Sequence, residues 1–295
     1  MELHKIVDRM WLVPGRNQGR FPFSHAIWVE GERKILFDAG TGQDVMAAFL
    51  RSHPVDVAFA SHSHPGHLAS FWLLDGTPLF APVQSKTSFG NLEKLAERFV
   101  EDESARKLWI ALYRKVLGFR DVTHTHTYDG QTGLDLQTLK LAAVHTPGHT
   151  TDHHCFFEEH TGTLLAFDLD LSTAGPFYCS RESDLESFRA SLHLIRSYEP
   201  EVLVSSHMGV LRTGITEAID RFLAVLDDRD RRILAATQEP VPLEQLVDRH
   251  LLIPRFPENL APIYREWERR MLRAHLERLQ DQHEVEQTED GFRTP

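Results

Sequence analysis

The sequence predicts an α/β protein of 295 residues that ends in a mainly helical segment. Two observations predict this class. Up to about Ile215, short apolar runs typical of strands alternate with stretches that have helical spacing. Beyond this residue the strand pattern stops, and three helical stretches follow with prolines between them. A third observation, that several apolar strands end in histidine or aspartate, indicates where the chemistry lies.

The amino-terminal half begins with strands, which fill the first 40 residues. Two apolar runs around Glu30-Gly31-Glu32, in "HAIWVEGERKILFDAG", predict a hairpin. The next elements are a helix in "DVMAAFLRS", a buried strand in "VDVAFA", the start of a helix in "HLASFWLL" and a strand in "TPLFAP". Residues 86–118 carry apolar side chains at three- and four-residue spacing, which predicts two helices.

Strands dominate again after this helical insert. We expect them in "THTHTYDG" and in "LDLQTLKLAAVHTPGHT", followed by a hairpin in "HHCFFEEHTGTLLAFDLD" that turns at Thr161-Gly162. A helix in "DLESFRASLHLIRSY" then leads to a strand in "EVLVSSHMG" that ends at a histidine.

In the carboxyl-terminal segment, the spacing of apolar residues predicts helices in "ITEAIDRFLAVLDDRDRRILAAT", "PLEQLVDRHL" and "APIYREWERRMLRAHLERLQ". A two-stranded wing turning at Asp290-Gly291 would complete a small winged-helix-like domain. We therefore predict two domains, residues 1–222 and 223–295.

The composition is that of an ordinary soluble protein, with 41% hydrophobic and 25% charged residues. We expect a cytoplasmic protein with no membrane contact, because the chain lacks an apolar run of about 20 residues and a secretory leader pattern. A net charge of −11 argues against a generally basic surface that would bind nucleic acid. The two cysteines, Cys155 and Cys179, offer no disulfide framework.

Four apolar strands end in residues that can bind a metal ion. A His-x-His turn can direct two imidazoles at one ion, and imidazole together with carboxylate suits Zn²⁺, Fe²⁺ or Mn²⁺. The motifs lack thiolates, which disfavours a structural zinc finger. The alternating His124 and His126 are expected to face solvent and are not included. The candidate ligands are His62, His64, His67, His149, Asp168 and His207.

In their order along the chain, "ILFDAG", "HSHPGH", "TPGHT", "LLAFD" and "SSHMG" resemble the motifs of the metallo-β-lactamase superfamily over about residues 1–222. The resemblance implies an αββα sandwich with metals at one edge. It further implies that the first metal is bound by His62, His64 and His149, the second by His67 and His207, and both by a bridging Asp168. Asp38 matches a buried carboxylate that supports the site. The segment "TPGHTTDHHCFF" is similar to that of glyoxalase II and the acyl-homoserine lactonases, and His153 is expected to be structural.

Gly66 departs from the family motif His-x-His-x-Asp-His, in which an aspartate binds the second metal. Asp152 or Asp170 could replace that carboxylate, the second ion could bind weakly, or the site could be degenerate. We expect a bound metal with a weakened second site, because a degenerate site would have lost more than one ligand.

These observations predict a metal-dependent hydrolase with one or two zinc ions, or Fe or Mn, acting on a small thioester, lactone or ester. Asp168 and His207 are the predicted catalytic residues, and Phe177 and Tyr178 are candidate substrate contacts. The alternatives are a single-stranded RNA endoribonuclease or other phosphodiesterase, a non-catalytic metal-binding relative, and an iron persulfide dioxygenase that uses His62, His149 and Asp168. A homodimer is expected. Nucleic acid is the less favoured partner, although one helix carries a stripe made of Arg265, Arg269 and Arg273.

Overall fold

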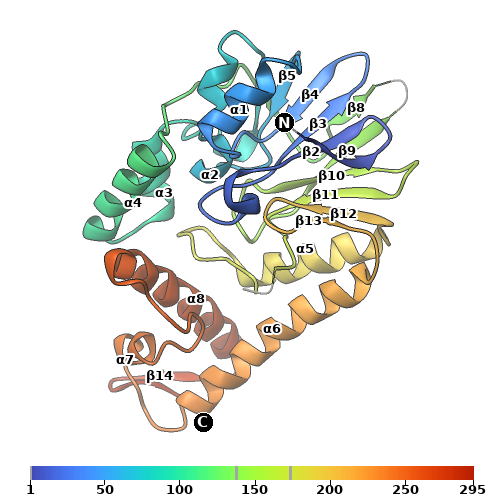
Figure 1. Cartoon of the computed structure of the whole chain (residues 1–295). Helices are drawn as coiled ribbons and strands as arrows, with labels where there is room; N and C mark the ends of the chain where they lie inside the picture. Colours follow the sequence, from blue (N-terminus) through green and yellow to red (C-terminus); the bar gives the residue numbers. More distant parts are fainter. Residues whose placement is uncertain (1, 137–138, 173–174) are drawn as a thin grey trace.

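The computed structural model describes residues 2–136, 139–172 and 175–295. Two β-sheets pack face to face, and helices cover both outer faces (Figure 1). This arrangement confirms the predicted αββα sandwich.

The first sheet has seven strands, which lie side by side in the order in which they follow one another along the chain. The predicted hairpin forms its centre, with Ile27 opposite Phe37. From β4 onward neighbouring strands run parallel, so their carboxyl ends meet at one edge. The strands are β1 (His4–Val7), β2 (Met10–Val13), β3 (Ala26–Glu30), β4 (Lys34–Phe37), β5 (Val57–Phe59), β6 (Leu79–Pro82) and β7 (His126–Tyr128).

The second sheet has six strands in the order β13-β12-β11-β10-β9-β8. The predicted hairpin turns at Gly162, whose φ of 58° favours glycine. The predicted strand over "LDLQTLKLAAVH" is two paired strands, and its residues 137–138 lie outside the described residues. The strands are β8 (Gly133–Asp135), β9 (Lys140–His145), β10 (His154–Glu158), β11 (Thr163–Phe167), β12 (Val202–Ser205) and β13 (Gly209–Leu211), the last of which was not predicted.

Three helices of the sandwich begin at polar side chains that cap them. Asn91, Asp102 and Asp184 each accept a hydrogen bond from a backbone N–H of the first turn. The helix predicted in "HLASFWLL" is instead two short pieces, because the Ser70 N–H bonds to the Ala39 carbonyl and so leaves the helical pattern. The helices are η1 (Arg16–Gly19), α1 (Gln43–Leu50), α2 (Pro65–Leu68), η2 (Phe71–Leu74), η3 (Val83–Ser85), α3 (Leu92–Phe99), α4 (Glu103–Val116) and α5 (Leu185–Ser197).

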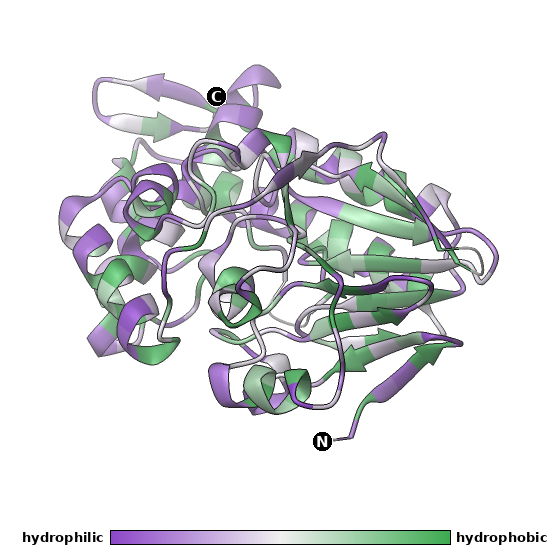
Figure 2. Cartoon of the chain, turned by 90° about the horizontal axis from the view of Figure 1, so that it is seen from above, coloured by the Kyte–Doolittle hydropathy of each residue, from purple (hydrophilic) through white to green (hydrophobic). Residues whose placement is uncertain are grey.

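The core between the two sheets is aromatic and aliphatic. Phe156 of the second sheet is fully buried, and its ring lies 4.7 Å from that of Phe37 and 6.0 Å from that of Phe59. Figure 2 shows hydrophobic residues concentrated in the strands and hydrophilic residues on the outer helices. Burial of these side chains is the main force that holds the sheets together.

The carboxyl-terminal segment consists of α6 (Ile215–Ala236), α7 (Leu243–Asp248), α8 (Ala261–Asp281) and a hairpin of β14 (Glu286–Thr288) and β15 (Gly291–Arg293). The helices and the hairpin were predicted, whereas a winged-helix classification and the division at 222/223 remain predictions. Residue 222 lies inside α6, which continues without interruption across the predicted boundary. Helix α8 contacts α4, α5 and α6, and its Met271 joins the same apolar cluster as Phe188 of α5 (Figure 1). Within the described residues, no helix is both long enough and apolar enough to cross a membrane.

Candidate metal centre

The six predicted ligand residues lie together at one edge of the sandwich. His62, His64 and His67 follow β5, and His149 lies in the turn between β9 and β10. Asp168 and His207 follow the parallel strands β11 and β12, whose carboxyl ends are adjacent. The fold therefore brings residues far apart in the chain to one place. Two groups of ligand atoms form within 4.8 Å, one of His62, His64, His149 and Asp168, the other of His67, Asp168 and His207.

Three imidazole nitrogens converge in the first group. The Nδ1 of His64 lies 3.0 Å from the Nε2 of His62 and 2.9 Å from the Nε2 of His149. The Ser61 hydroxyl donates to Asp38 at 2.7 Å, so it can only accept from the Nδ1–H of His62. The Nδ1–H of His149 donates to the Phe177 carbonyl at 2.6 Å. Both Nε2 atoms therefore present lone pairs to the centre, as metal ligands do.

The second group has the same character but fewer ligands. The Nδ1–H of His207 donates to the Gly19 carbonyl at 2.6 Å, and its Nε2 faces Asp168 Oδ1 at 3.4 Å. The Nε2 of His67 lies 3.1 Å from the same oxygen. Asp168 Oδ1 is buried and has no hydrogen-bond partner among the described residues. A buried carboxylate oxygen without a hydrogen bond, facing imidazole nitrogens, fits a cation between them.

Asp168 connects the two groups. Its Oδ2 lies 3.3 Å from His149 Nε2 and 3.6 Å from His62 Nε2, while its Oδ1 faces the second group. The backbone N–H of Asp168 donates to the Nε2 of His153 at 3.3 Å, and the Nδ1–H of His153 donates to the Thr146 hydroxyl. Both nitrogens of His153 are thus used to hold the loop, in agreement with its predicted structural role.

Asp38 supports both groups of ligands through hydrogen bonds on the side away from Asp168. This fully buried carboxylate accepts hydrogen bonds from the Ser61 backbone and from the Nδ1–H of His67, each at 2.8 Å. Its φ of 61° is unfavourable for an L-residue. Its hydrogen bonds offset this strain, because they orient His67 directly and His62 through Ser61.

The electrostatics of the centre favour neutral imidazole at His62 and His64 and charge at Asp168. Burial lowers the pKa of His62 and His64 well below the usual value, and neighbouring histidines lower both further. Burial also disfavours the charged form of His67, but Asp168 and Asp38 outweigh it and raise its pKa to about 10. Burial opposes ionisation of Asp168, yet His67 and His207 hold its pKa well below the usual value. A cation between these groups would take the place of protons.

Gly66 lies in α2 between His64 and His67. Neither Asp152 nor Asp170 belongs to the two ligand groups formed by the described residues. Asp152 is fully buried beside Arg98, and despite this burial the guanidinium lowers its pKa to about 2. Asp170 accepts from the Ser172 backbone. The second group therefore has three protein ligands, which suffices for a catalytic site with a free position.

Arg98 of α3 forms a buried network that the sequence did not reveal. Its guanidinium donates to Ser63, Thr151 and Glu182, and it lies 3.1 Å from Asp152. Ser63 lies between two ligands in the chain, and Thr151 follows His149 by two residues. Arg98 thus fixes the helical insert against both ligand loops. Its partners are distant in sequence, so no local motif could indicate them.

The segment after Asp168 differs in part from the prediction. Phe177 is half-buried beside His149, with ring centroids 6.1 Å apart. Tyr178 is not placed to contact a substrate, because it is 1% exposed and points toward the carboxyl-terminal helices. Its hydroxyl donates to His275 Nε2 at 2.5 Å, and His275 Nδ1–H donates to Asp230 at 2.6 Å. Residues 173–174 of the predicted lining lie outside the described residues.

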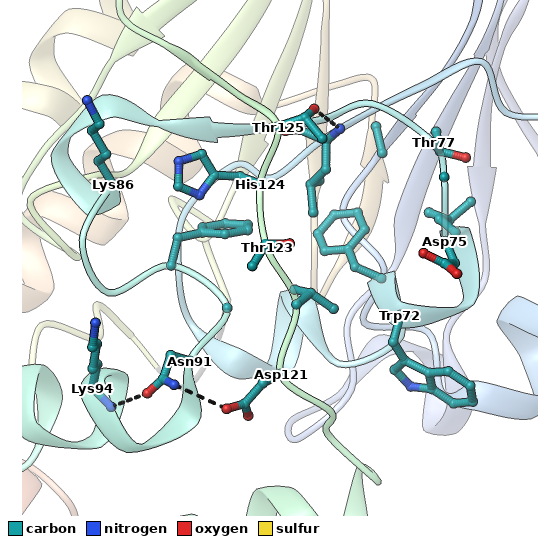
Figure 3. A pocket seen from close by; sticks show the side chains of 18 of the residues that line it. Trp72, Asp75, Thr77, Lys86, Asn91, Lys94, Asp121, Thr123, His124 and Thr125 are labelled. Carbon is teal, nitrogen blue, oxygen red and sulfur yellow. Dashed lines mark hydrogen bonds between the residues drawn. The ribbon is translucent and has the colours of Figure 1, made fainter.

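A surface pocket of about 820 Å³ lies on the outer side of the first sheet, away from the metal centre (Figure 3). Of the residues that the structure describes, none of the six candidate ligands lines it. Its polar groups bond to one another, as Asn91 does to Asp121 and to the Lys94 backbone. His124 lines this pocket and His126 is exposed, so neither joins the metal centre.

Comparison with known proteins agrees with this geometry. Residues 19–207 match the model of the metallo-beta-lactamase superfamily. Thioesterase pkgB of Emericella nidulans is 34% identical over 238 residues, which cover 79% of this chain and 58% of that protein. An atrochrysone carboxyl ACP thioesterase of Passalora fulva is 23% identical over 219 residues, 71% of this chain and 56% of that protein. The match therefore spans a little over half the length of each of these relatives.

Solved structures with the same fold match the chain almost throughout. A beta-lactamase domain protein from Burkholderia ambifaria has a TM-score of 0.77 and 17% identity, with 100% of this chain and 94% of that chain covered. A metallo-beta-lactamase family protein from Thermus thermophilus has a TM-score of 0.72 and 20% identity, with 99% of this chain and 100% of that chain covered. With the motifs, the sandwich and the matched family model in agreement, this chain belongs to the metallo-beta-lactamase superfamily.

Proposed function

We propose that the chain is a metal-dependent hydrolase of acyl thioesters. The convergence of three imidazole nitrogens on Asp168, with each remote nitrogen of His62 and His149 held by a hydrogen bond, is the observation that carries the proposal. The names of the relatives, which are thioesterases, favour a thioester over a lactone or a simple ester.

His62, His64, His149 and Asp168 would hold a first divalent ion, zinc being the best fit to this donor set, with Fe or Mn as alternatives. His67, His207 and Asp168 would hold a second. A bound ion supplies a Lewis acid and lowers the pKa of its water toward neutrality. Asp168 would orient that water, because its two oxygens face both groups. Of the four histidines that lie within 4 Å of Asp168, His207 has the most exposed side chain, so a substrate would approach from its side.

The alternative of an RNA-cutting enzyme receives little support from α8. Arg265 pairs with Glu244 and Asp248, and Arg269 pairs with Glu244 and with buried Glu266. Phosphates would have to displace these carboxylates before the arginines could bind them. The homodimer and the non-catalytic alternative remain predictions.

Hydrolysis of acyl pantetheine thioesters by the zinc-loaded protein tests the proposal, with lactones and a labelled single-stranded RNA as the other substrates. We expect thioester turnover that falls at least about 100-fold in His149→Ala. The matched control is His160→Ala, which removes an exposed histidine on a turn and is expected to leave turnover intact. Equal loss in both variants, or cleavage of RNA and of no thioester, would contradict the proposal. Oxygen uptake with a glutathione persulfide and bound iron would instead support the dioxygenase alternative.

A further inference from the structure

Solvent reaches the metal centre beside His207. Among the histidines that face Asp168 closely, the His207 side chain is 20% exposed, whereas His62 is 0%, His149 2% and His67 3% exposed. His64, on the far side of the first group, is also only half-buried. The surface around His207 therefore offers a substrate access to the second group of ligands.

This surface is apolar. Among the described residues five large hydrophobic side chains are exposed, and two of them, Phe21 at 45% and Met208 at 48%, belong to the two segments that meet at His207. Met208 follows His207 directly in the chain. Phe21 lies two residues after Gly19, whose carbonyl accepts the Nδ1–H of His207. Exposed apolar side chains on two segments that meet beside a buried polar centre favour a binding surface, whereas singly scattered ones need no explanation.

An aromatic row continues this surface across the centre. The ring of Phe21 meets that of Trp267 edge-on, with centroids 5.9 Å apart, and Trp267 meets Phe177 in the same way at 5.0 Å. Phe177 is the residue whose carbonyl holds His149. The row thus runs from the loop that holds His207 to the loop that holds His149. Trp267 of α8 is the middle member of this row. It is 8% exposed and packs against Tyr264, with ring centroids 4.9 Å apart.

We propose that Phe21 and Met208, with Phe177 and Trp267 behind them, bind the acyl group of an aromatic acyl thioester. The inference rests on the proposed function and specifies its substrate class. An aryl group presents a flat apolar face to the Phe21 ring and to the Met208 thioether, two partners that favour aromatic contact. The carbonyl carbon attached to this group then lies beside His207 and Asp168. Helix α8 gives the carboxyl-terminal segment its role, which is to complete the acyl-binding surface.

The test measures binding separately from turnover. The probes are S-phenacyl-pantetheine, a non-hydrolysable aryl ketone, and S-acetonyl-pantetheine, its small counterpart. Their Kd values are measured by calorimetry on the zinc-loaded full chain, for the natural protein and for the double variant Phe21→Ala/Met208→Ala. The control is Leu194→Ala, which removes an apolar side chain of α5 that is 39% exposed.

We expect the preference for the phenacyl over the acetonyl probe to fall about tenfold in the double variant and to stay unchanged in the control. The preference in kcat/KM for benzoyl over acetyl thioester should fall by a similar factor. An unchanged preference in the double variant overturns the inference. A change from dimer to monomer in light scattering also overturns it, because the surface would then be occupied by a second copy. Should the natural protein show the expected probe preference yet hydrolyse no thioester, the proposed function fails while the acyl-binding surface stands.

Discussion

Gly66→Asp restores a carboxylate at the position where the family has one, and should strengthen the second metal site. The backbone accepts the change, because Gly66 is helical and a Cβ added to it meets the Pro22 carbonyl at 3.2 Å as its nearest described contact. This contact requires a shift of a few tenths of an ångström, and aspartate regains only about 0.1–0.3 kcal/mol of helix propensity over glycine. Pro22 belongs to the loop whose Gly19 holds His207, so the new side chain would point toward the second group.

The expected gain follows from charge. Two unit charges 4 Å apart attract by about 4 kcal/mol at an effective dielectric constant of 20, and more when one is divalent. Repulsion between the new carboxylate and both Asp168 and Asp38 cancels part of this attraction. We expect a net gain of about 1.4–2.8 kcal/mol, which is about 10- to 100-fold in affinity for the second zinc ion.

Competition with a chromophoric chelator measures both zinc affinities. The control is Gly66→Ala, which adds the same Cβ but no ligand, and thermal unfolding checks that both variants fold. Gly66→Asp should raise the second affinity and Gly66→Ala should not. If the two variants bind the second ion equally, position 66 does not face the metal and the argument for a weakened site is wrong.

Three further predictions concern stability. Arg98→Met leaves the fully buried Asp152 without its cation and should lower the free energy of unfolding in urea by about 3–5 kcal/mol, while Arg98→Lys loses less. Phe156→Ala empties the centre of the sandwich and should lower it by about 3–5 kcal/mol with an unchanged urea m-value. The hydrogen bond from Arg269 lowers the pKa of Glu244 from its usual 4.5 to about 2, so its stabilisation is present above pH 4.5 and lost as the pH falls toward 2. Glu244→Gln should therefore reduce the loss of urea stability between pH 5 and pH 3, and an unchanged slope would contradict the ion pair.

Most of the fold and the position of the metal centre could be predicted from the sequence, because the signals were local. Apolar runs that end in histidine or aspartate locate β5, β11 and β12, and the parallel pairing of β11 with β12 brings Asp168 and His207 together. The strand of residues 209–211 was missed because a three-residue run that begins with a glycine carries too short a pattern.

The contacts between distant segments could not be predicted. Arg98 and Glu182 are 84 residues apart, and nothing near either residue in sequence indicates the other. Tyr178 was expected at the substrate, like Phe177, because their segment follows Asp168, but adjacent residues of an extended segment point in opposite directions. Its partner, His275, lies 97 residues further along the chain.

The most direct test is the number and position of zinc ions bound to the full chain, determined by elemental analysis and by anomalous diffraction at the zinc edge. We predict a tightly held ion among His62, His64, His149 and Asp168, and a weaker one at His67 and His207. Replacing His62 and His149 together with alanine should abolish the first. A protein that binds no transition metal when loaded, or a double variant that retains its ion undiminished, would contradict a shared cation at this edge of the sandwich.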